Sequence, residues 1–247
     1  MELKDEIEKF RSIITESNNI VFFGGAGVST ASGIPDFRSK DGLYNQKDIQ
    51  FEKYAPEYLL DRDCLKHNTI VFYEFYRQKL DTRHIEPNIT HYKLAELEKI
   101  GKLKAIITQN IDGLHQKAGS KKVYEIHGTT QRNYCNKCGK QFSSDFIFEN
   151  SDKIPRCECG GFVRPDVVLY GESLPSEAWN KAFNAIALAD TLIVAGTSLQ
   201  VYPAANLVNY FSGKNLVVIN KEKLNGVHNV DLCINADMVE VFKHLTI

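Results

Sequence analysis

Two close pairs of cysteines are the residues of this chain best suited to chemistry: Cys135 with Cys138, and Cys157 with Cys159. In a reducing cytosol, paired thiols of this kind favour metal binding over disulfide formation. Four thiolates match a tetrahedral zinc site, which is closed to water and therefore structural. We expect one Zn²⁺ ion held by these four side chains. Buried free thiols or a redox pair are the alternatives.

A glycine-rich loop, Gly24 to Thr30, follows an unbroken apolar run at 20–23. Two glycines, Gly25 and Gly27, placed after a strand are typical of a loop that cradles a dinucleotide pyrophosphate. Glycine lets the backbone approach the phosphates, and the start of a helix offers free N–H groups. The motif is incomplete, since Thr30 stands where a third glycine is usual. A tight turn without a ligand is the alternative interpretation.

The hexapeptide 33–38 places Asp36, Phe37 and Arg38 just after this loop. A guanidinium there could pair with phosphate, and an aromatic ring could lie against a flat heterocycle. A surface turn begun by Gly33 and Pro35 is the competing interpretation.

Amide and carboxylate side chains follow a second apolar segment at 104–108. Gln109, Asn110 and Asp112 come where that predicted strand ends, and doubly wound sheets bind ligands at the carboxyl ends of their strands. A loop that bonds its own backbone through Asn and Asp is the alternative. The acidic ribose-binding residue of an ordinary dehydrogenase is missing from this strand end.

A histidine, His127, closes a short predicted strand at 124–128, and Gly128 leaves space beside it. Histidine titrates closest to neutral pH and suits the role of general base. A purely structural histidine is the alternative, so the case for a base depends on the groups around it.

The elements that position these residues alternate along the chain. Apolar runs at 20–23, 104–108, 191–195 and 215–219 predict buried parallel strands, and residues 1–17, 89–100, 176–189 and 203–211 predict helices. This alternation predicts an α/β fold, a Rossmann-like doubly wound parallel sheet with a small zinc-binding module and a helical insertion. We expect 1–37, 89–127 and 172–247 to form the sheet domain. The helical insertion 38–88 and the module 128–171 would form the small domain, and Cys64 and Cys233 would lie in the core.

Composition narrows the class of protein. Hydrophobic residues make up 43% and charged residues 25%, as in ordinary globular proteins. Lys plus Arg is 30 and Asp plus Glu is 31, a balance that argues against dedicated nucleic-acid binding. The first six residues lack the apolar core of a signal peptide, and no apolar run approaches the ~18 residues of a membrane span. We expect a cytoplasmic protein without membrane or nucleic-acid partners.

From about residue 18 to the C-terminus the sequence resembles the sirtuin family of NAD-dependent protein deacylases. The resemblance depends on the ordered combination of these segments: Gly25 to Ser29, Gly33 to Arg38, Thr108 to Asp112, His127-Gly128, the four cysteines, Pro165 to Val168 and Gly196 to Leu199.

The resemblance implies a cleft between the two domains that NAD and an extended acyl-lysine peptide enter from opposite sides. NAD would act as co-substrate, and the single Zn²⁺ would be structural. The implied contacts are Ala26 and Thr30 at phosphate and ribose, Phe37 at nicotinamide, Arg38 at the substrate-ready conformation, Gln109 and Asn110 at the nicotinamide ribose or its water, Ile111 and Asp112 at the carboxamide, Thr197 and Ser198 at phosphate or adenosine, Asn220 at the adenosine ribose and Asp237 near adenine.

The implied mechanism is acyl transfer to ADP-ribose. The acyl oxygen attacks the ribose carbon that bears nicotinamide, which leaves and gives an alkylimidate. His127 then removes a ribose hydroxyl proton so that this oxygen attacks the imidate carbon, with Asn110 as the second catalytic residue. Water completes the reaction, which yields free lysine and O-acyl-ADP-ribose.

Peptide binding in the family resembles strand addition between two extended segments, here 168–172 and 198–202. Desuccinylase-like relatives place a Tyr and an Arg three positions apart on a helix. Tyr73 fits the tyrosine, but the position three later is Tyr76, and Arg77 is one further. One position rotates a helical side chain by ~100°, so we expect acetyl to be preferred over succinyl.

Three other functions compete with this one. A protein mono-ADP-ribosyltransferase would use the same NAD site without requiring acyl-lysine. A zinc-ribbon adaptor would sense NAD without turnover, which His127 argues against. An ordinary dehydrogenase fits least, because the ribose-binding acid is missing.

Overall fold

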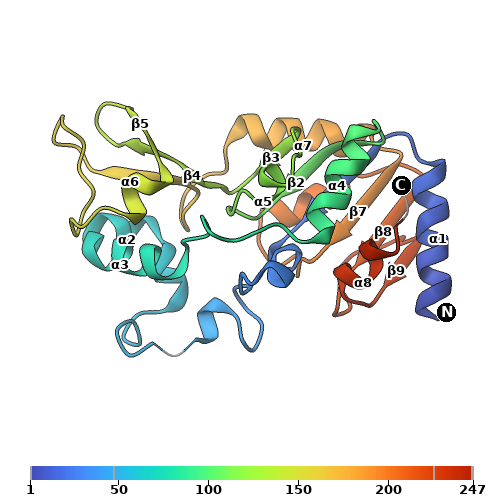
Figure 1. The fold of residues 1–247 in the computed structure, drawn as a ribbon, viewed down its shortest axis with the longest axis horizontal. Helices are drawn as coiled ribbons and strands as arrows, with labels where there is room; N and C mark the ends of the chain where they lie inside the picture. The colour runs from blue at the N-terminus through green and yellow to red at the C-terminus, as the bar shows by residue number, and fades with distance from the viewer. Residues whose placement is uncertain (1, 47, 225, 246–247) are drawn as a thin grey trace.

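A six-stranded parallel sheet forms the centre of the larger part of the molecule (Figure 1). The computed structural model describes residues 2–46, 48–224 and 226–245. Within them the strand order is β3-β2-β1-β7-β8-β9, and every neighbouring pair is parallel. The strands are β1 Ile20–Gly24, β2 Leu103–Thr108, β3 Val123–Glu125, β7 Thr191–Ala195, β8 Asn215–Ile219 and β9 Leu232–Ile234. The predicted doubly wound parallel sheet is confirmed.

Helices cover both faces of this sheet because its central strands are apolar on both sides. In β1, Ile20 and Phe22 face one core, while Val21 and Phe23 face the other. The first core also contains α1 Leu3–Glu16, α4 Ile89–Lys99 and α8 Met238–Lys243. The second contains α7 Ser176–Leu188 and the 3₁₀ segment η5 Ala204–Tyr210, so that the sheet lies between two layers (Figure 1).

A second, three-stranded antiparallel sheet lies at the end of the molecule away from the termini (Figure 1). Its order is β5-β4-β6, and it shares one core with the segment between residues 43 and 80. Its elements are β4 Gly128–Cys135, β5 Gln141–Ser143, α6 Ser144–Phe148 and β6 Val163–Val167, and the packed segment contains η3 Leu43–Asn45, η4 Pro56–Leu60, α2 Arg62–His67 and α3 Thr69–Lys79. The residue boundaries proposed for the two domains remain a prediction.

The helical stretch expected at 203–211 is present as a 3₁₀ segment at 204–210. Cys64 is buried as expected, but Cys233 is exposed because it alternates with two buried neighbours on the short strand β9. In the described part of the chain, no helix is long and apolar enough to span a membrane.

Candidate functional site

The carboxyl ends of the central strands meet at one edge of the large sheet. Gly24 at the end of β1 pairs with Thr108 of β2 on one side and with Ala195 of β7 on the other. Ala195 in turn pairs with Ile219 of β8. The loops that follow these strands therefore start side by side, which is the place where such sheets bind ligands.

The glycine loop after β1 is pressed against the loop after β7. The Gly27 N–H donates to the Gly196 carbonyl at 2.8 Å. A Cβ added to Gly25 would lie 2.8 Å from Thr197 Cβ, and one added to Gly27 would lie 2.8 Å from Gly196 Cα. Glycine is needed here because any side chain would push the two loops apart.

The glycine loop does not open into a long helix, which corrects one expectation. It continues into two single 3₁₀ turns, η1 Ala26–Val28 and η2 Thr30–Ser32. The second turn ends at Gly33, whose φ of 93° is left-handed and breaks the helical path. The loop therefore offers backbone N–H groups without the dipole of a full helix.

Three polar side chains form a buried cluster between the glycine loop and the end of β2. The Ser29 hydroxyl donates to Asp112 Oδ2 at 2.7 Å and accepts a bond from Asn110 Nδ2 at 3.1 Å. The Leu114 N–H donates to the other oxygen, Asp112 Oδ1, at 2.9 Å. Burial raises the pKa of Asp112, while these hydrogen bonds act in the opposite direction. The sequence analysis did not select Ser29, although it lies inside the quoted glycine motif.

A small cavity of about 40 Å³ lies beside this cluster. Five of the selected residues line it together: Ala26, Phe37, Asn110, Ile111 and Asp112. The rest of the wall consists of residues to which no site role was assigned from the sequence. Ser29, Ile34 and Pro35 lie inside the quoted motifs, whereas Leu43, Lys79, Leu80 and Thr82 lie outside them. Apolar groups form most of the wall, and an amide and a carboxyl group project from the end of β2.

His127 lies in the turn between β3 and β4, two positions beyond the end of the strand that was expected to carry it. Its Nδ1 is 3.0 Å from the Gln109 carbonyl oxygen, and the Gln109 amide donates to Thr197 Oγ1 at 2.9 Å. Burial lowers the pKa of His127, and the bond to Gln109 partly offsets this. A carbonyl only accepts, so Nδ1 carries the proton and Nε2 bears the lone pair of a base.

Gly128 explains why the chain can turn directly after this histidine. Its φ is 76°, and an added Cβ would lie 2.0 Å from the Asp166 carbonyl oxygen on β6. On the other side of the turn, the Val168 N–H donates to the His127 carbonyl at 2.9 Å. The histidine backbone is thus fixed between the two sheets.

The remaining selected residues lie around this centre in other settings. Thr30 Oγ1 donates to the Gly27 carbonyl at 3.0 Å, and Ser198 is exposed. Arg38 Nη2 donates to Tyr170 Oη at 3.3 Å. Asn220 and Asp237 lie at the β8–β9 side of the same sheet edge, where Asn220 Nδ2 donates to the Glu222 carbonyl and Asp237 caps α8 and pairs with Lys221.

The four selected cysteines converge at one point of the small sheet. Their sulfur atoms all lie within 4.8 Å of one another, with Cys135 Sγ 3.4 Å from Cys159 Sγ and Cys138 Sγ 3.8 Å from Cys157 Sγ. Four sulfurs at ~2.3 Å from a tetrahedral Zn²⁺ would be separated by ~3.8 Å. The donor set and spacing therefore fit one zinc ion. A Cβ on Gly161 would lie 2.6 Å from Cys135 Sγ, so this glycine keeps the sulfur cluster open.

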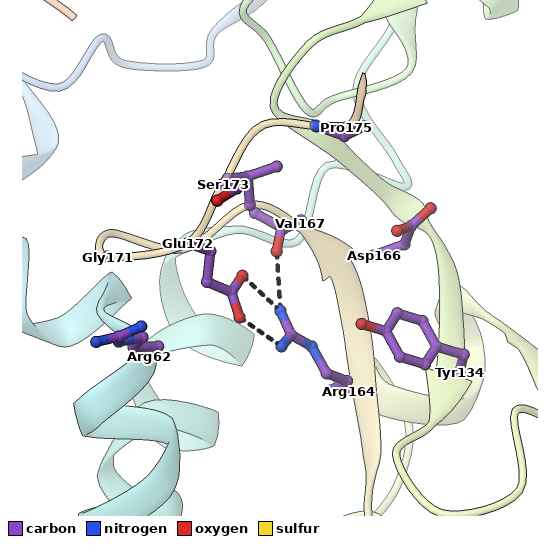
Figure 2. A pocket seen from close by; sticks show the side chains of 10 residues that line it. Arg62, Tyr134, Arg164, Asp166, Val167, Gly171, Glu172, Ser173 and Pro175 are labelled. Carbon is purple, nitrogen blue, oxygen red and sulfur yellow. Dashed lines mark hydrogen bonds and ion pairs between the residues drawn. The ribbon is translucent and has the colours of Figure 1, made fainter. Parts of the chain in front are cut away.

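A larger hollow of about 390 Å³ lies beside the extended segment after β6 (Figure 2). Arg164 forms a two-pronged ion pair across it with Glu172, at 2.7 and 3.0 Å, and also donates to the Val167 carbonyl at 3.1 Å. Glu172 Oε2 accepts from the Leu169 N–H at 3.0 Å. These bonds fold the segment 167–172 into a fixed shape.

One edge of that segment is already paired. The Tyr170 N–H donates to the Leu60 carbonyl at 3.0 Å, and the Arg62 N–H donates to the Tyr170 carbonyl at 3.1 Å. Asp61 and Tyr170 accordingly form a parallel bridge. The insertion at 56–62 therefore supports the segment that the sequence analysis selected for peptide pairing.

The side chains considered for acidic acyl groups are engaged in the small sheet. Tyr73 Oη donates to the Val163 carbonyl at 2.6 Å. The Arg77 guanidinium donates to the carbonyls of Ile147 at 2.8 Å and Asp152 at 2.9 Å. Neither group lines the cavity beside Asp112.

Comparison with known proteins identifies the family of this chain. The Sir2 family model matches residues 25–203. An NAD-dependent protein deacetylase of Clostridium perfringens is 53% identical to this chain, in an alignment that covers 97% of this chain and 98% of the relative. An NAD-dependent protein deacetylase of Clostridium acetobutylicum is 51% identical, and the alignment covers 98% of this chain and 99% of the relative. A solved Sir2 structure with deacetylated p53 peptide and 3'-O-acetyl ADP ribose has a TM-score of 0.85 at 37% identity, covering 96% of each chain. The chain belongs to the Sir2 family.

Proposed function

We propose that this protein removes acetyl groups from lysine side chains of proteins, with NAD as co-substrate and with nicotinamide and O-acetyl-ADP-ribose as products. The observation that carries the proposal is the setting of His127. Its Nδ1 is bonded to the Gln109 carbonyl at the sheet edge that also holds the glycine loop, which leaves Nε2 as a base. The relatives named as deacetylases match over nearly the whole chain.

The co-substrate fits the described edge. The loops after β1 and β7 start side by side at the carboxyl ends of their strands, which supports a pyrophosphate site near Ala26, Thr197 and Ser198. The lining of the small cavity, rather than its size, supports a flat carboxamide-bearing ring there: Phe37 and Ile111 are apolar, and Asp112 and Asn110 supply polar contacts. Asn220 and Asp237, at the β8–β9 side, are assigned to the adenosine half.

The chain's own residues would carry out three tasks in the reaction. The apolar wall of the cavity excludes water from the nicotinamide end, and Arg38 with Phe37 would close over it. His127 accepts a ribose hydroxyl proton at Nε2, and its lowered pKa keeps that nitrogen unprotonated at neutral pH. Asn110, held by Ser29, would orient the ribose or its water.

One structural zinc ion belongs to this proposal. Cys135, Cys138, Cys157 and Cys159 would bind it as four thiolates and leave no open position, so the ion would supply no chemistry to the reaction. The partners would be acyl-lysine proteins bound as extended peptides. We place the protein in the cytoplasm, where its six cysteines would stay reduced, four of them as zinc ligands.

The deciding experiment is incubation with NAD and an acetyl-lysine peptide, followed by mass spectrometry. We expect deacetylated peptide, nicotinamide and O-acetyl-ADP-ribose in equal amounts. ADP-ribose attached to the protein or peptide, without dependence on the acetyl group, would instead indicate the mono-ADP-ribosyltransferase. Release of acetate without O-acetyl-ADP-ribose would overturn the proposal.

The preference for acetyl over succinyl follows from the hydrogen bonds that Tyr73 and Arg77 already make within the protein. Tyr73 and Arg77 are bonded to the carbonyls of Val163 and Ile147, so neither is free to pair with a succinyl carboxylate. Lys79, the cation of the same helix that lines the cavity, is paired with Asp48 at 3.5 Å. We expect turnover on an acetyl-peptide to exceed that on the matched succinyl-peptide by roughly a hundredfold or more, since an unpaired buried carboxylate is costly. Comparable rates on the two peptides would contradict this.

A further inference from the structure

Two histidines that the proposed mechanism does not use lie together behind the candidate site. His91 on α4 is 0% exposed, and His115 on α5 Leu114–Lys117 is 1% exposed. Their ring centroids are 4.8 Å apart, with the planes tilted by 59°. His115 also meets Phe22 of β1 edge-on at 6.1 Å. The pair therefore lies between two helices and the central strand.

Most of the polar atoms of these rings have no protein partner among the described residues. His91 Nδ1 accepts from the Asn88 N–H at 3.2 Å, so Nδ1 is unprotonated and Nε2 carries the hydrogen. His91 Nε2, both ring nitrogens of His115, and the hydroxyls of Thr90 and Ser120 are buried without a partner. Buried polar atoms normally find a partner, often an ordered water.

Both histidines are tied to the loops that form the co-substrate site. Asn88, the cap of α4, donates through Nδ2 to the Val28 carbonyl at 2.8 Å and to Ser32 Oγ at 2.9 Å. On the other side, α5 begins at Leu114, whose N–H is bonded to Asp112. The imidazoles thus connect the glycine loop with the Asp112 turn.

The surroundings keep the two rings uncharged. Burial lowers the pKa of His91 to about 4. Burial, with a smaller contribution from the neighbouring His91, lowers the pKa of His115 well below its ordinary value. Charged side chains of the packed elements pair with one another, in Lys93–Glu96 on α4, Lys117–Glu86 beside α5 and Lys243–Glu240 on α8. The adjacent carboxylate, Asp112, is bonded to Ser29 and Leu114.

We propose that the uncharged His91 and His115 rings are joined through buried water and that this arrangement positions the Asp112 turn for NAD. His91 Nε2–H donates to the water, the water donates to one His115 nitrogen, and the other His115 nitrogen bonds to a further water. These are positioning residues, because they act through Asp112 and touch no reacting atom. The inference rests on the proposed function for its NAD readout.

The first test compares His115→Phe, His115→Gln and His91→Gln with wild type in steady-state kinetics. Loss of one hydrogen bond at a positioning residue corresponds to roughly a tenfold change. We expect His115→Phe to raise KM for NAD roughly tenfold while KM for the acetyl-peptide stays within about twofold. His115→Gln, which keeps a donor and an acceptor, should restore most of the affinity. His67→Phe, at an exposed position on α2, is the matched control.

The second test needs neither NAD nor activity. In wild type labelled with ¹⁵N-histidine, we expect the side chains of His91 and His115 to remain neutral at pH 5.5. His91 should carry its proton on Nε2, and its signals are assigned by their absence in His91→Gln. A charged imidazolium at either position at that pH would overturn the proposal even if the variants fail to fold. Unchanged KM for NAD in a folded His115→Phe would do so too. A wild type that consumes no NAD would refute the proposed function, while the spectra would still decide whether the pair exists.

Discussion

The side chains at the edge of the large sheet and the cysteines of the small sheet are held in place by different kinds of partner. At the edge, Ser29, Asn110 and Asp112 bond to one another, and Gln109 links His127 to Thr197. The four thiols, in contrast, face mainly each other. The first arrangement is fixed by the chain alone, whereas the second gains its partner only with a metal ion.

The strands of the two regions differ in how they are covered. All residues of β1 and β7 are buried, between helices on both faces. The strand β5 has only three residues, with Gln141 and Ser143 exposed and Phe142 half-buried. The small sheet shares its core with the segment between residues 43 and 80, and a metal would add a cross-link between the two loops that carry the cysteines.

Removal of zinc tests this contrast most strongly. Because the binding energy of a structural zinc site is on the order of 10 kcal/mol, Cys135→Ser or strong chelation should unfold the small sheet. Hydrogen exchange should lose protection in 128–167, while fluorescence of Trp179 on α7 stays native-like. Cys233→Ser, outside the cluster, is the control. If the exchange protection and the native Trp179 fluorescence were lost in a single transition, the small and the large sheet would unfold as one cooperative unit.

Replacement of the histidine base should affect chemistry and leave stability alone. We expect His127→Ala to lower kcat by roughly 10²- to 10⁴-fold, the usual contribution of general base catalysis. The melting temperature should change little, because the Gln109 carbonyl can bond to water instead. The exposed His228→Ala is the control. A variant within tenfold of wild type would remove His127 from the catalytic role.

Two glycines of the small module with the same backbone conformation allow a sharper comparison. Gly128 has φ 76° and Gly139 has φ 72°, but only at Gly128 does an added Cβ meet backbone, at 2.0 Å from Asp166 O. Gly139→Ala should cost about 1–2 kcal/mol from the left-handed conformation alone. Gly128→Ala should cost about 3 kcal/mol or more, since the turn must also shift. Equal losses in chemical denaturation would contradict this.

Acid should weaken the large sheet region through its buried histidines. The folded-state pKa of His91 is about 4 against an ordinary value of 6.5, so the unfolded chain binds more protons between these values. Stability should be flat above pH 6.5 and fall by on the order of 2 kcal/mol by pH 4. The Asp112 carboxyl, with its raised pKa, acts with the opposite sign. In His91→Gln, the free energy of unfolding measured by urea denaturation should therefore fall less steeply between pH 6.5 and pH 4 than in wild type. The same pH dependence in both proteins would contradict the assignment.

The sequence predicted the long elements well and the short ones poorly. The apolar runs at 20–23 and 215–219 became β1 and β8 almost to the residue, because central parallel strands are apolar throughout. Strands of three residues, such as β5 and β9, carry no periodicity and were missed.

The candidate site was predicted where its residues follow a buried strand. Asn110, Ile111 and Asp112 share one cavity with Ala26 and Phe37, residues that the resemblance assigns to NAD. The opposite wall, with Leu80 and Thr82, comes from the end of a helical segment far away in sequence, and no local pattern marks it. The exact roles of the individual contacts stay predictions.

The bridge between Asp61 and Tyr170 makes the insertion a lateral brace for the segment after β6. Leu60 and Arg62 bond to the backbone of Tyr170, and Glu172 bonds to the N–H and to the carbonyl of Leu169. The shape of this segment is therefore set by contacts from two directions. Trimming the loop at 56–62 would remove the first set of contacts and leave the second.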